Sequence, residues 1–340
     1  MKRRDVLKSS IGIGAALALP AIVTTSAWAQ AAYTMRLSHV FPPQHTLSKL
    51  AAQYAEAVKM ETGGKVAVEI LGSGQAFAEK ESYPAVAKGQ IEATLLVSVQ
   101  FSGIVPTLDA LAIPFLLQGK DAAPKFLASA ARKSLDNEIR ARRIEPLAWL
   151  LQTRTSIFTS KTKPLLTPED FAGLKIRGLN KVVDASFTAV KASALATPGS
   201  EVYQALESGV LDAAMTDVGA ALSRRYNEVQ KYGTVGPNHL MVFGMLIANP
   251  EWVKKLPPDL KSGLDRAAAR LEASAIGEAE ANVASSIDGL KAKGMAITVL
   301  SDEQVATWAK LMTPASRTAF VERSGDAAKA VLAAFDGLSK

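Results

Sequence analysis

The sequence of 340 residues contains no cysteine and only three histidines, His39, His45 and His239. The absence of cysteine excludes disulfides, thiol nucleophiles and thiolate metal ligands. The histidines form no His-Glu-x-x-His zinc motif, and no Gly-x-Ser-x-Gly motif supplies a nucleophilic serine. We therefore expect neither a metal nor a cofactor, and a fold that is stabilised by burial alone.

A strongly apolar segment long enough to span a membrane is also missing at the N-terminus. Lys2-Arg3-Arg4 gives a charged start with a twin-arginine pair, residues 11–23 are apolar but rich in Gly and Ala, and Ala27-Trp28-Ala29 offers a small-x-small cleavage signature. An uncleaved anchor would need roughly 20 strongly apolar residues. We expect residues 1–29 to be a twin-arginine-type signal peptide, cleaved after Ala29, and the mature protein to be periplasmic.

Blocks of charge of one sign are absent as well. The chain has 39 basic and 32 acidic residues, a net charge of +7, and removal of residues 1–29 leaves 35 basic and 31 acidic residues, or +4. These charges are scattered, so the sequence predicts no nucleic-acid partner and no polybasic membrane patch. The mature 311 residues exceed a typical single domain, which favours two lobes.

Alternating strand and helix patterns organise the first part of the mature chain. Short runs with apolar alternation are separated by helical periodicity and by Gly or Pro turns, which is typical of βαβ units and a largely parallel sheet. We assign residues 30–153 to a first lobe, to which the segment 240–258 returns. Its predicted strands and helices cover residues 33–37, 47–58, 66–70, 79–88 and 91–97.

The segment 154–239 is predicted to form a second lobe of the same kind. Its expected elements are a strand at 174–177, helices at 182–192 and 200–208, a strand at 211–215 and a helical pattern at 220–232.

Residues 259–293 are almost all helix formers, and a single helix of that length would reach roughly 50 Å and could span both lobes as a spine. The alternative is two helices that are broken at Gly277. The remaining residues, 294–340, are expected to form a strand and two helices that pack on the lobes. Ser301 and Gln304 have the spacing of a capping box at the start of the first of these helices.

The most informative motif leads to Arg177. It reads Pro164-Leu-Leu-Thr-Pro-Glu-Asp-Phe-Ala-Gly-Leu-Lys-Ile-Arg177, a turn-rich entry into a short strand that ends on the arginine. In open α/β sheets, ligands bind outside the carboxyl ends of strands. A guanidinium group there matches a carboxylate with two parallel hydrogen bonds. The alternative is an ordinary surface arginine.

The pattern from residue 164 to 232 resembles the DctP-type periplasmic solute-binding proteins of TRAP transporters. The resemblance implies an α/β, two-lobe periplasmic-binding-protein fold with a long helix spanning both lobes, and a binding protein rather than an enzyme. It implies that an organic acid is captured between the lobes, which close around it, and is delivered to the membrane subunits of a TRAP permease. Arg177 matches the family arginine that clamps the ligand carboxylate. A monomer is expected.

Three further candidates follow from the same resemblance. Arg154 comes after the apolar strand 146–151, where the family often carries a second ligand-facing arginine; an interlobe salt bridge is the alternative. Thr216 stands where many relatives, reading Val-Asp-Gly-Gln-Glu-Asn-Pro, have a ligand-contacting asparagine. Asp217 is expected either to contact a ligand group or to cap the following helix. The departures from the family motif in this segment argue against sialic-acid or sugar-acid specificity.

Five more residues are candidates for the cavity wall. Val97 and Phe101 are expected to make the wall apolar, which favours a small aromatic or aliphatic carboxylate; their alternative place is the hydrophobic core. Gln100 lies between them. His39, at the end of the first strand, faces the predicted crevice or is a structural residue. Glu79 follows a loop that matches the corresponding family loop only approximately.

Two other functions share these features. An exported enzyme acting on a carboxylate would need an acid–base pair of residues that lie far apart in the sequence, and such pairs are invisible in a sequence. A periplasmic ligand-sensing module would have the same fold and site as a transport receptor. Turnover of a bound acid would indicate the enzyme, and recovery of unchanged ligand would indicate a receptor.

Overall fold

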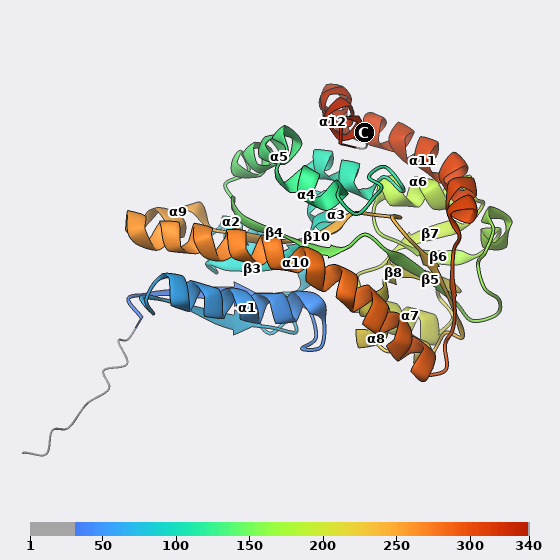
Figure 1. Ribbon diagram of the computed structural model, residues 1–340, viewed down its shortest axis with the longest axis horizontal. Coiled ribbons are helices and arrows are strands. Elements are labelled where there is room, and N and C mark those ends of the chain that lie inside the picture. The colour runs from blue at the N-terminus through green and yellow to red at the C-terminus, as the bar shows by residue number, and fades with distance from the viewer. Residues whose placement is uncertain (1–30, 339–340) are drawn as a thin grey trace, which may run out of the picture. The chain divides into compact units, whose positions relative to one another are not determined.

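Two β-sheets form the framework of the protein (Figure 1). The structure, a computed structural model, describes residues 31–338, so the predicted signal peptide and its cleavage site lie outside the described residues. The first lobe is built on a five-stranded sheet with the order β2-β1-β3-β10-β4, and the second lobe on a six-stranded sheet with the order β11-β9-β5-β8-β6-β7. The strands of the first sheet are β1 (Tyr33–Ser38), β2 (Val66–Leu71), β3 (Ala93–Val97), β4 (Glu145–Thr153) and β10 (Val242–Ala248); those of the second are β5 (Ser156–Ser160), β6 (Lys175–Gly178), β7 (Ser193–Ala196), β8 (Ala213–Asp217), β9 (Tyr232–Gly236) and β11 (Ala296–Val299).

The two sheets are mixed, and the prediction of a largely parallel sheet is wrong at the strands that connect the lobes. The β1–β2, β1–β3, β6–β7, β6–β8 and β9–β11 pairs are parallel, as βαβ units require. However, β10 runs antiparallel to β3 and β4, and β5 runs antiparallel to β8 and β9. The path of the chain explains these antiparallel pairs: β4 passes almost directly into β5, and β10 returns between β3 and β4.

Short helices follow the carboxyl ends of the strands in both lobes. In the first lobe β3 runs directly into α3 (Ser98–Phe101), and in the second lobe β8 runs directly into α8 (Val218–Ser223) and β6 leads to α6 (Lys181–Ala189). Asn180 caps α6 by accepting hydrogen bonds from the backbone N–H groups of Val182 and Val183. The helices of the first lobe are α1 (Thr46–Glu61), α2 (Glu79–Ala87), α3 (Ser98–Phe101), α4 (Ala122–Leu127), α5 (Ala130–Arg140), α9 (Pro250–Lys254) and the 3₁₀ helix η1 (Pro106–Ala112); those of the second are α6 (Lys181–Ala189), α7 (Val202–Glu207), α8 (Val218–Ser223), η2 (Pro168–Phe171) and η3 (Tyr226–Glu228).

The helical pattern predicted for residues 220–232 is interrupted in the structure. Helix α8 ends at Ser223, Arg225 takes a positive φ of 59°, a single 3₁₀ turn follows, and β9 begins at Tyr232. A left-handed backbone conformation at a non-glycine residue ends helical hydrogen bonding. The residues of the predicted helical pattern therefore belong to three separate elements, α8, η3 and β9.

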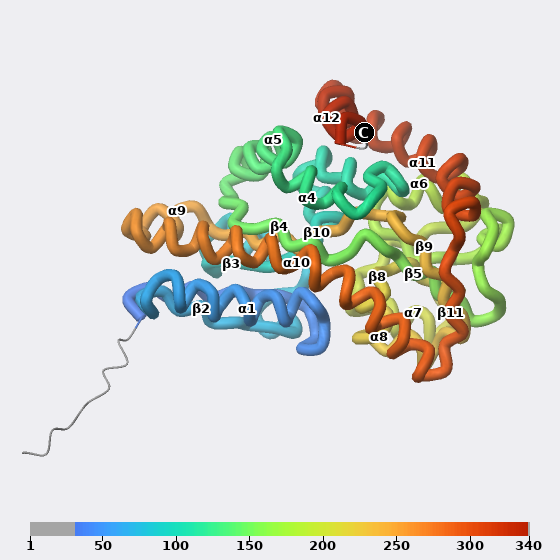
Figure 2. Tube along the Cα trace, in the orientation of Figure 1, coloured from blue at the N-terminus to red at the C-terminus, as the bar shows by residue number. Residues whose placement is uncertain are grey.

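Residues 258–292 form one continuous helix, α10 (Pro258–Ala292), of 35 residues. It packs against α1 and β4 of the first lobe and against α8 and β11 of the second lobe (Figures 1 and 2). The helix passes through Gly277 without a break, so the prediction of a single spine helix is confirmed and the alternative of two helices is wrong. Together with the two sheets, α10 confirms the predicted two-lobe α/β fold.

The chain ends in α11 (Asp302–Ser324) and α12 (Asp326–Asp336). The predicted capping box is present, since the Ser301 side chain accepts from the Gln304 backbone N–H and the Gln304 side chain accepts from the Ser301 backbone N–H. Helix α11 packs on α6 and contacts η1. Within residues 31–338, none of the helices combines the length and the apolar character that a membrane span requires.

We predict that two glycines of α10 respond oppositely to alanine. A Cβ at Gly277 would meet nothing within 4 Å, so Gly277→Ala should stabilise the mature protein by about 0.5–1 kcal/mol through helix propensity. A Cβ at Gly263 would lie 2.9 Å from Thr62 Cγ2 and 3.0 Å from the Glu61 carbonyl oxygen, so Gly263→Ala should cost about 1–3 kcal/mol. Urea unfolding of both variants measures the difference, and equal effects would contradict the packing of α10 on α1.

Candidate functional site

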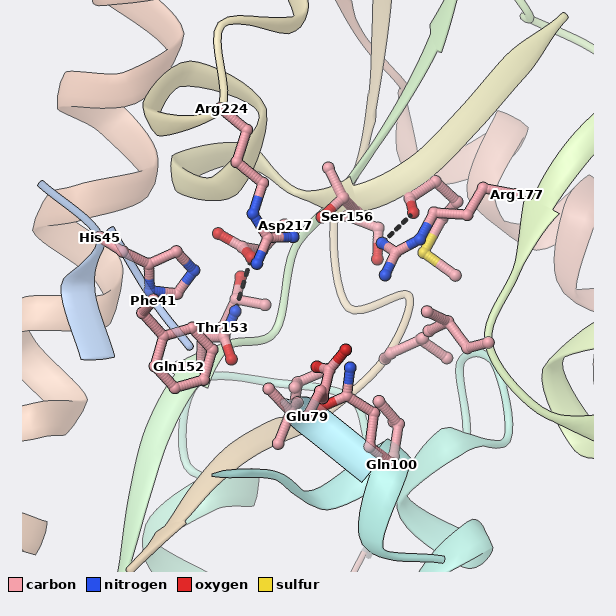
Figure 3. Close-up of a pocket in the computed structure, with 17 residues that line it drawn as sticks. Phe41, His45, Glu79, Gln100, Gln152, Thr153, Ser156, Arg177, Asp217 and Arg224 are labelled. Atoms are coloured by element: carbon pink, nitrogen blue, oxygen red, sulfur yellow. Dashed lines mark hydrogen bonds between the residues drawn. The ribbon is translucent and has the colours of Figure 1, made fainter. Parts of the chain in front are cut away.

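A cavity of about 50 Å³ lies where the carboxyl ends of β3, β6 and β8 approach the crossing from β4 to β5 (Figure 3). Residues of both lobes line it. A second cavity of about 370 Å³ adjoins it and shares Glu79, Val99, Gln100, Arg177 and Leu179. The first-lobe lining consists of Phe41, His45, Glu79, Val97, Val99, Gln100, Gln152, Thr153, Leu240 and Val242, and the second-lobe lining of Ser156, Arg177, Leu179, Met215, Thr216, Asp217 and Arg224.

Arg177 is the buried cation of this cavity. It belongs to β6, and only 4% of its surface is exposed. Its Nε donates to the carbonyl oxygen of Thr197 at 3.1 Å, and its Nη1 donates to the carbonyl oxygen of Met215 at 3.1 Å. Among residues 31–338 no carboxylate forms an ion pair with it, and burial lowers its pKa. The guanidinium is thus held by neutral carbonyls, and an anion in the cavity would compensate its charge.

Asp217 and Gln152 form a polar pair that joins the lobes. Asp217 ends β8 and caps α8, because its Oδ1 accepts from the Ala220 backbone N–H at 2.7 Å. Its Oδ2 accepts from Gln152 Nε2 at 2.6 Å. Burial raises the pKa of Asp217, while the Ala220 N–H and the nearby Arg224 act to lower it. The helix cap is the second of the two roles predicted for Asp217.

Arg224 is a second cation at the cavity, and sequence reasoning did not select it. It follows α8, and its guanidinium lies beside Asp217 (Figure 3). A Cβ at Gly199 would overlap its Nη1, so glycine is required there for this placement. The sequence shows adjacent arginines, Arg224 and Arg225, in an expected helix. In the structure the helix ends at Ser223 and Arg224 lines the cavity, while Arg225 pairs with Glu228 at 3.5 Å on the surface.

His45 lines the cavity in place of the predicted His39. His45 caps α1, and its Nδ1 accepts from the Leu47 backbone N–H at 3.1 Å. Burial lowers the pKa of His45 to about 3, so the ring is neutral and carries its proton on Nε2. His39 is buried outside the cavity, where its Nδ1 accepts from the Phe41 backbone N–H and its ring covers Gly72. In the sequence, His45 stands directly before an amphipathic helix, and this position was the available signal that His45 could cap the helix.

The structure brings six of the nine predicted site residues together and leaves three elsewhere. Phe101 is 1% exposed, because it lies on the face of α3 that packs into the first-lobe core against Tyr83. Arg154 lies outside the cavity; it pairs with Glu280 of α10 at 2.6 Å, the alternative weighed from the sequence. His39 is the third. The six that line the cavity are Glu79, Val97, Gln100, Arg177, Thr216 and Asp217.

The lining can bind and orient an anion. The guanidinium groups of Arg177 and Arg224 come from the second lobe, and neutral polar side chains of both lobes line the same space. Apolar side chains such as Val97 and Leu240 close it. Among the described residues, no group of three or more His, Asp or Glu side chains is arranged to hold a metal ion.

Comparison with known proteins gives a single family. Residues 37–323 match the family model DctP, described as bacterial extracellular solute-binding protein, family 7. The chain is 29% identical over 320 residues to the C4-dicarboxylate-binding periplasmic protein DctP of Rhodobacter capsulatus, covering 92% of this chain and 93% of that protein.

Solved structures agree in fold over nearly their whole length. A TRAP periplasmic solute-binding protein from Desulfovibrio salexigens with bound orotic acid is 25% identical, with a TM-score of 0.84, covering 90% of this chain and 98% of that chain. One from Sulfurospirillum deleyianum with bound succinate is 30% identical, with a TM-score of 0.80, covering 89% of this chain and 99% of that chain.

We predict that His45 and His239 stay neutral well below the usual histidine range. Burial lowers the pKa of each ring to about 3, against about 6.5 in the unfolded chain. Their contribution to stability is therefore present above pH 6.5 and is lost as the pH falls toward 3, by about 1.4 kcal/mol per pH unit for each ring. Asp109 and Asp184, with pKa values raised to about 6, act in the opposite direction. NMR of ¹⁵N-histidine separates the effects, and imidazolium signals from either ring at pH 5 would contradict the burial.

Proposed function

Since the chain belongs to family 7 of the bacterial extracellular solute-binding proteins, the DctP type, we propose that it binds a small organic carboxylate between its two lobes and delivers it to a TRAP-type permease. Members of this family are periplasmic receptors of transporters and are not enzymes, so the alternative of an exported enzyme is set aside. We retain the proposed division of the lobes after residue 153 and before residue 240.

The observation that carries the proposal is the unpaired buried charge of Arg177. A buried guanidinium without an anion is costly, and a ligand carboxylate would accept hydrogen bonds from the N–H groups that the Thr197 and Met215 carbonyls leave free. Thr216, in the next strand, lines the same cavity, and in this proposal its hydroxyl binds the same ligand group. Arg154 has no ligand role in this proposal, because its charge is already paired with Glu280.

Binding is coupled to closure of the lobes in this proposal. Arg177 comes from the second lobe, whereas Glu79, Gln100 and Gln152 come from the first, so one ligand in the cavity contacts both. A ligand shifts the population toward the closed arrangement only by its greater affinity for that arrangement. The closed form is then what the permease recognises.

The cavity volume and walls suggest a small ligand. The expected preference for an aromatic or aliphatic acid was based on Val97 and Phe101, and only Val97 lines the cavity. Phe41, Leu240 and Val242 supply apolar surface instead. We therefore keep a small ring or chain carboxylate as the proposed ligand, with its hydrocarbon part against these side chains.

A thermal-shift screen of residues 30–340 against organic acids tests the proposed function. An acid present at 100 times its dissociation constant should stabilise the protein by about 2.7 kcal/mol and raise the Tm by several degrees. The neutral amide of the same acid serves as its control, because it cannot pair with Arg177. Absence of a shift with every acid, or equal shifts with acid and amide, would contradict carboxylate recognition.

Substitution of Arg177 tests the carboxylate clamp. Arg177→Ala should weaken binding of the stabilising acid by about 2–4 kcal/mol, the scale for removing one partner of a buried charge pair. Arg177→Lys should also bind poorly, because an ammonium group cannot reproduce the planar fork. Calorimetry measures both, with Arg225→Ala, an exposed arginine outside the cavity, as the matched control. Less than a twofold change in affinity for Arg177→Ala would remove this residue from the site.

A further inference from the structure

We propose that the ligand carries, besides its carboxylate, an N–H or O–H group that donates a hydrogen bond to the carbonyl oxygen of Gln152. This inference rests on the proposed function of the cavity and narrows its ligand class to carboxylates with a hydrogen-bond donor, such as hydroxy acids, amino acids and lactam acids. It follows from the orientation of one buried amide, from its missing partner and from the charges around it.

The orientation of the Gln152 amide is fixed by Asp217. Asp217 already accepts from the Ala220 N–H through Oδ1; burial raises the pKa of Asp217, and the Ala220 N–H and the guanidinium of Arg224 beside it act to lower it. Gln152 presents its NH₂ group to this carboxyl, because its Nε2 donates to Asp217 Oδ2 at 2.6 Å. The carbonyl oxygen, Oε1, is consequently the atom that Gln152 has left for other partners (Figure 3).

The Oε1 atom of Gln152 has no hydrogen-bond partner among the described residues. Gln152 is 95% buried, since 5% of its surface is exposed, and Oε1 is inaccessible to solvent. Buried acceptors in proteins are nearly always paired, and an unpaired one costs free energy. Because Gln152 lines the cavity, a donor on the bound ligand is the partner that this atom can obtain when the lobes are closed.

The charges at the cavity favour a hydrogen-bond donor over a second anionic group. Arg177 and Arg224 bring two positive charges, and Asp217 and Glu79 bring two negative ones, while His45 is neutral. A ligand carboxylate at Arg177 adds one negative charge to the site. A second carboxylate next to Asp217 and the Gln152 oxygen would meet two acceptors, whereas an N–H or O–H group meets matching partners.

Matched ligand pairs test the inference directly. Calorimetry on residues 30–340 would compare acids that share one carboxylate and differ in a single donor: the lactam 5-oxopyrrolidine-2-carboxylate with its lactone analogue, and 2-hydroxy acids with their O-methyl ethers. We expect the member with the donor to bind about tenfold tighter or more. Equal affinities within pairs, or preference for the lactones and ethers, would overturn the donor requirement and leave carboxylate binding intact. If no acid binds, the proposed function fails, and the inference fails with it.

The variant Asp217→Asn gives a second, independent readout. The new amide can still cap α8 through its oxygen, and its NH₂ group would donate to Gln152, so that Gln152 turns and presents its own NH₂ group to the cavity. The preference for the donor-bearing member should therefore fall to parity or reverse. Asp212→Asn is the matched control: Asp212 accepts from the Lys175 N–H away from the cavity, and its substitution should preserve the preference. An unchanged preference in a folded Asp217→Asn protein would overturn the inference.

Discussion

The buried guanidinium of Arg177 is the constraint on which the cavity depends. The backbone holds it from two sides, with one carbonyl from Thr197 after β7 and one from Met215 in β8. β7 and β8 are the strands on either side of β6, which carries Arg177, so the sheet itself fixes the direction of the fork. Preorganised donors of this kind bind an anion without the cost of ordering a mobile side chain. The remaining lining residues then define what else the anion can carry.

Contacts between the lobes are made by a few polar side chains whose partners come from distant parts of the sequence. Gln152 reaches Asp217 across the cavity, and Arg154 Nη1 donates to the carbonyl oxygen of Gly119 at 2.7 Å. Asn180, at the start of α6, donates to Asp109 Oδ1 at 2.7 Å, and the same buried Asp109 pairs with Arg323 of α11 at 2.8 Å. These separate hydrogen bonds and ion pairs add to an apolar contact between the lobes, because one buried hydrophobic cluster contains Phe115 of the first lobe and Phe158 of the second.

The sequence predicted those features that depend on local pattern. Helix α10 follows from an unbroken run of helix formers, the two lobes from alternating strands and helices, and the place of Arg177 from a motif that ends a strand. The errors concern side-chain direction and chain path. Phe101 and Gln100 are neighbours on one short helix, yet one is core and the other faces the cavity, and sequence spacing alone does not decide which. Arg224 required knowledge of the backbone at Arg225 and of the missing side chain at Gly199, which are tertiary facts.

Helix α10 has a mechanical consequence for a protein that works by closing. A continuous helix of 35 residues, which curves along its length in Figures 1 and 2, packs on both lobes, so the lobes are not joined only by the connecting residues 154–155 and 237–241. Any rotation of one sheet relative to the other must either change the curvature of α10 or make α10 roll along the side chains of β4 or α8. The path of closure is therefore restricted, and the end point of the motion is set largely by how α10 fits against each lobe.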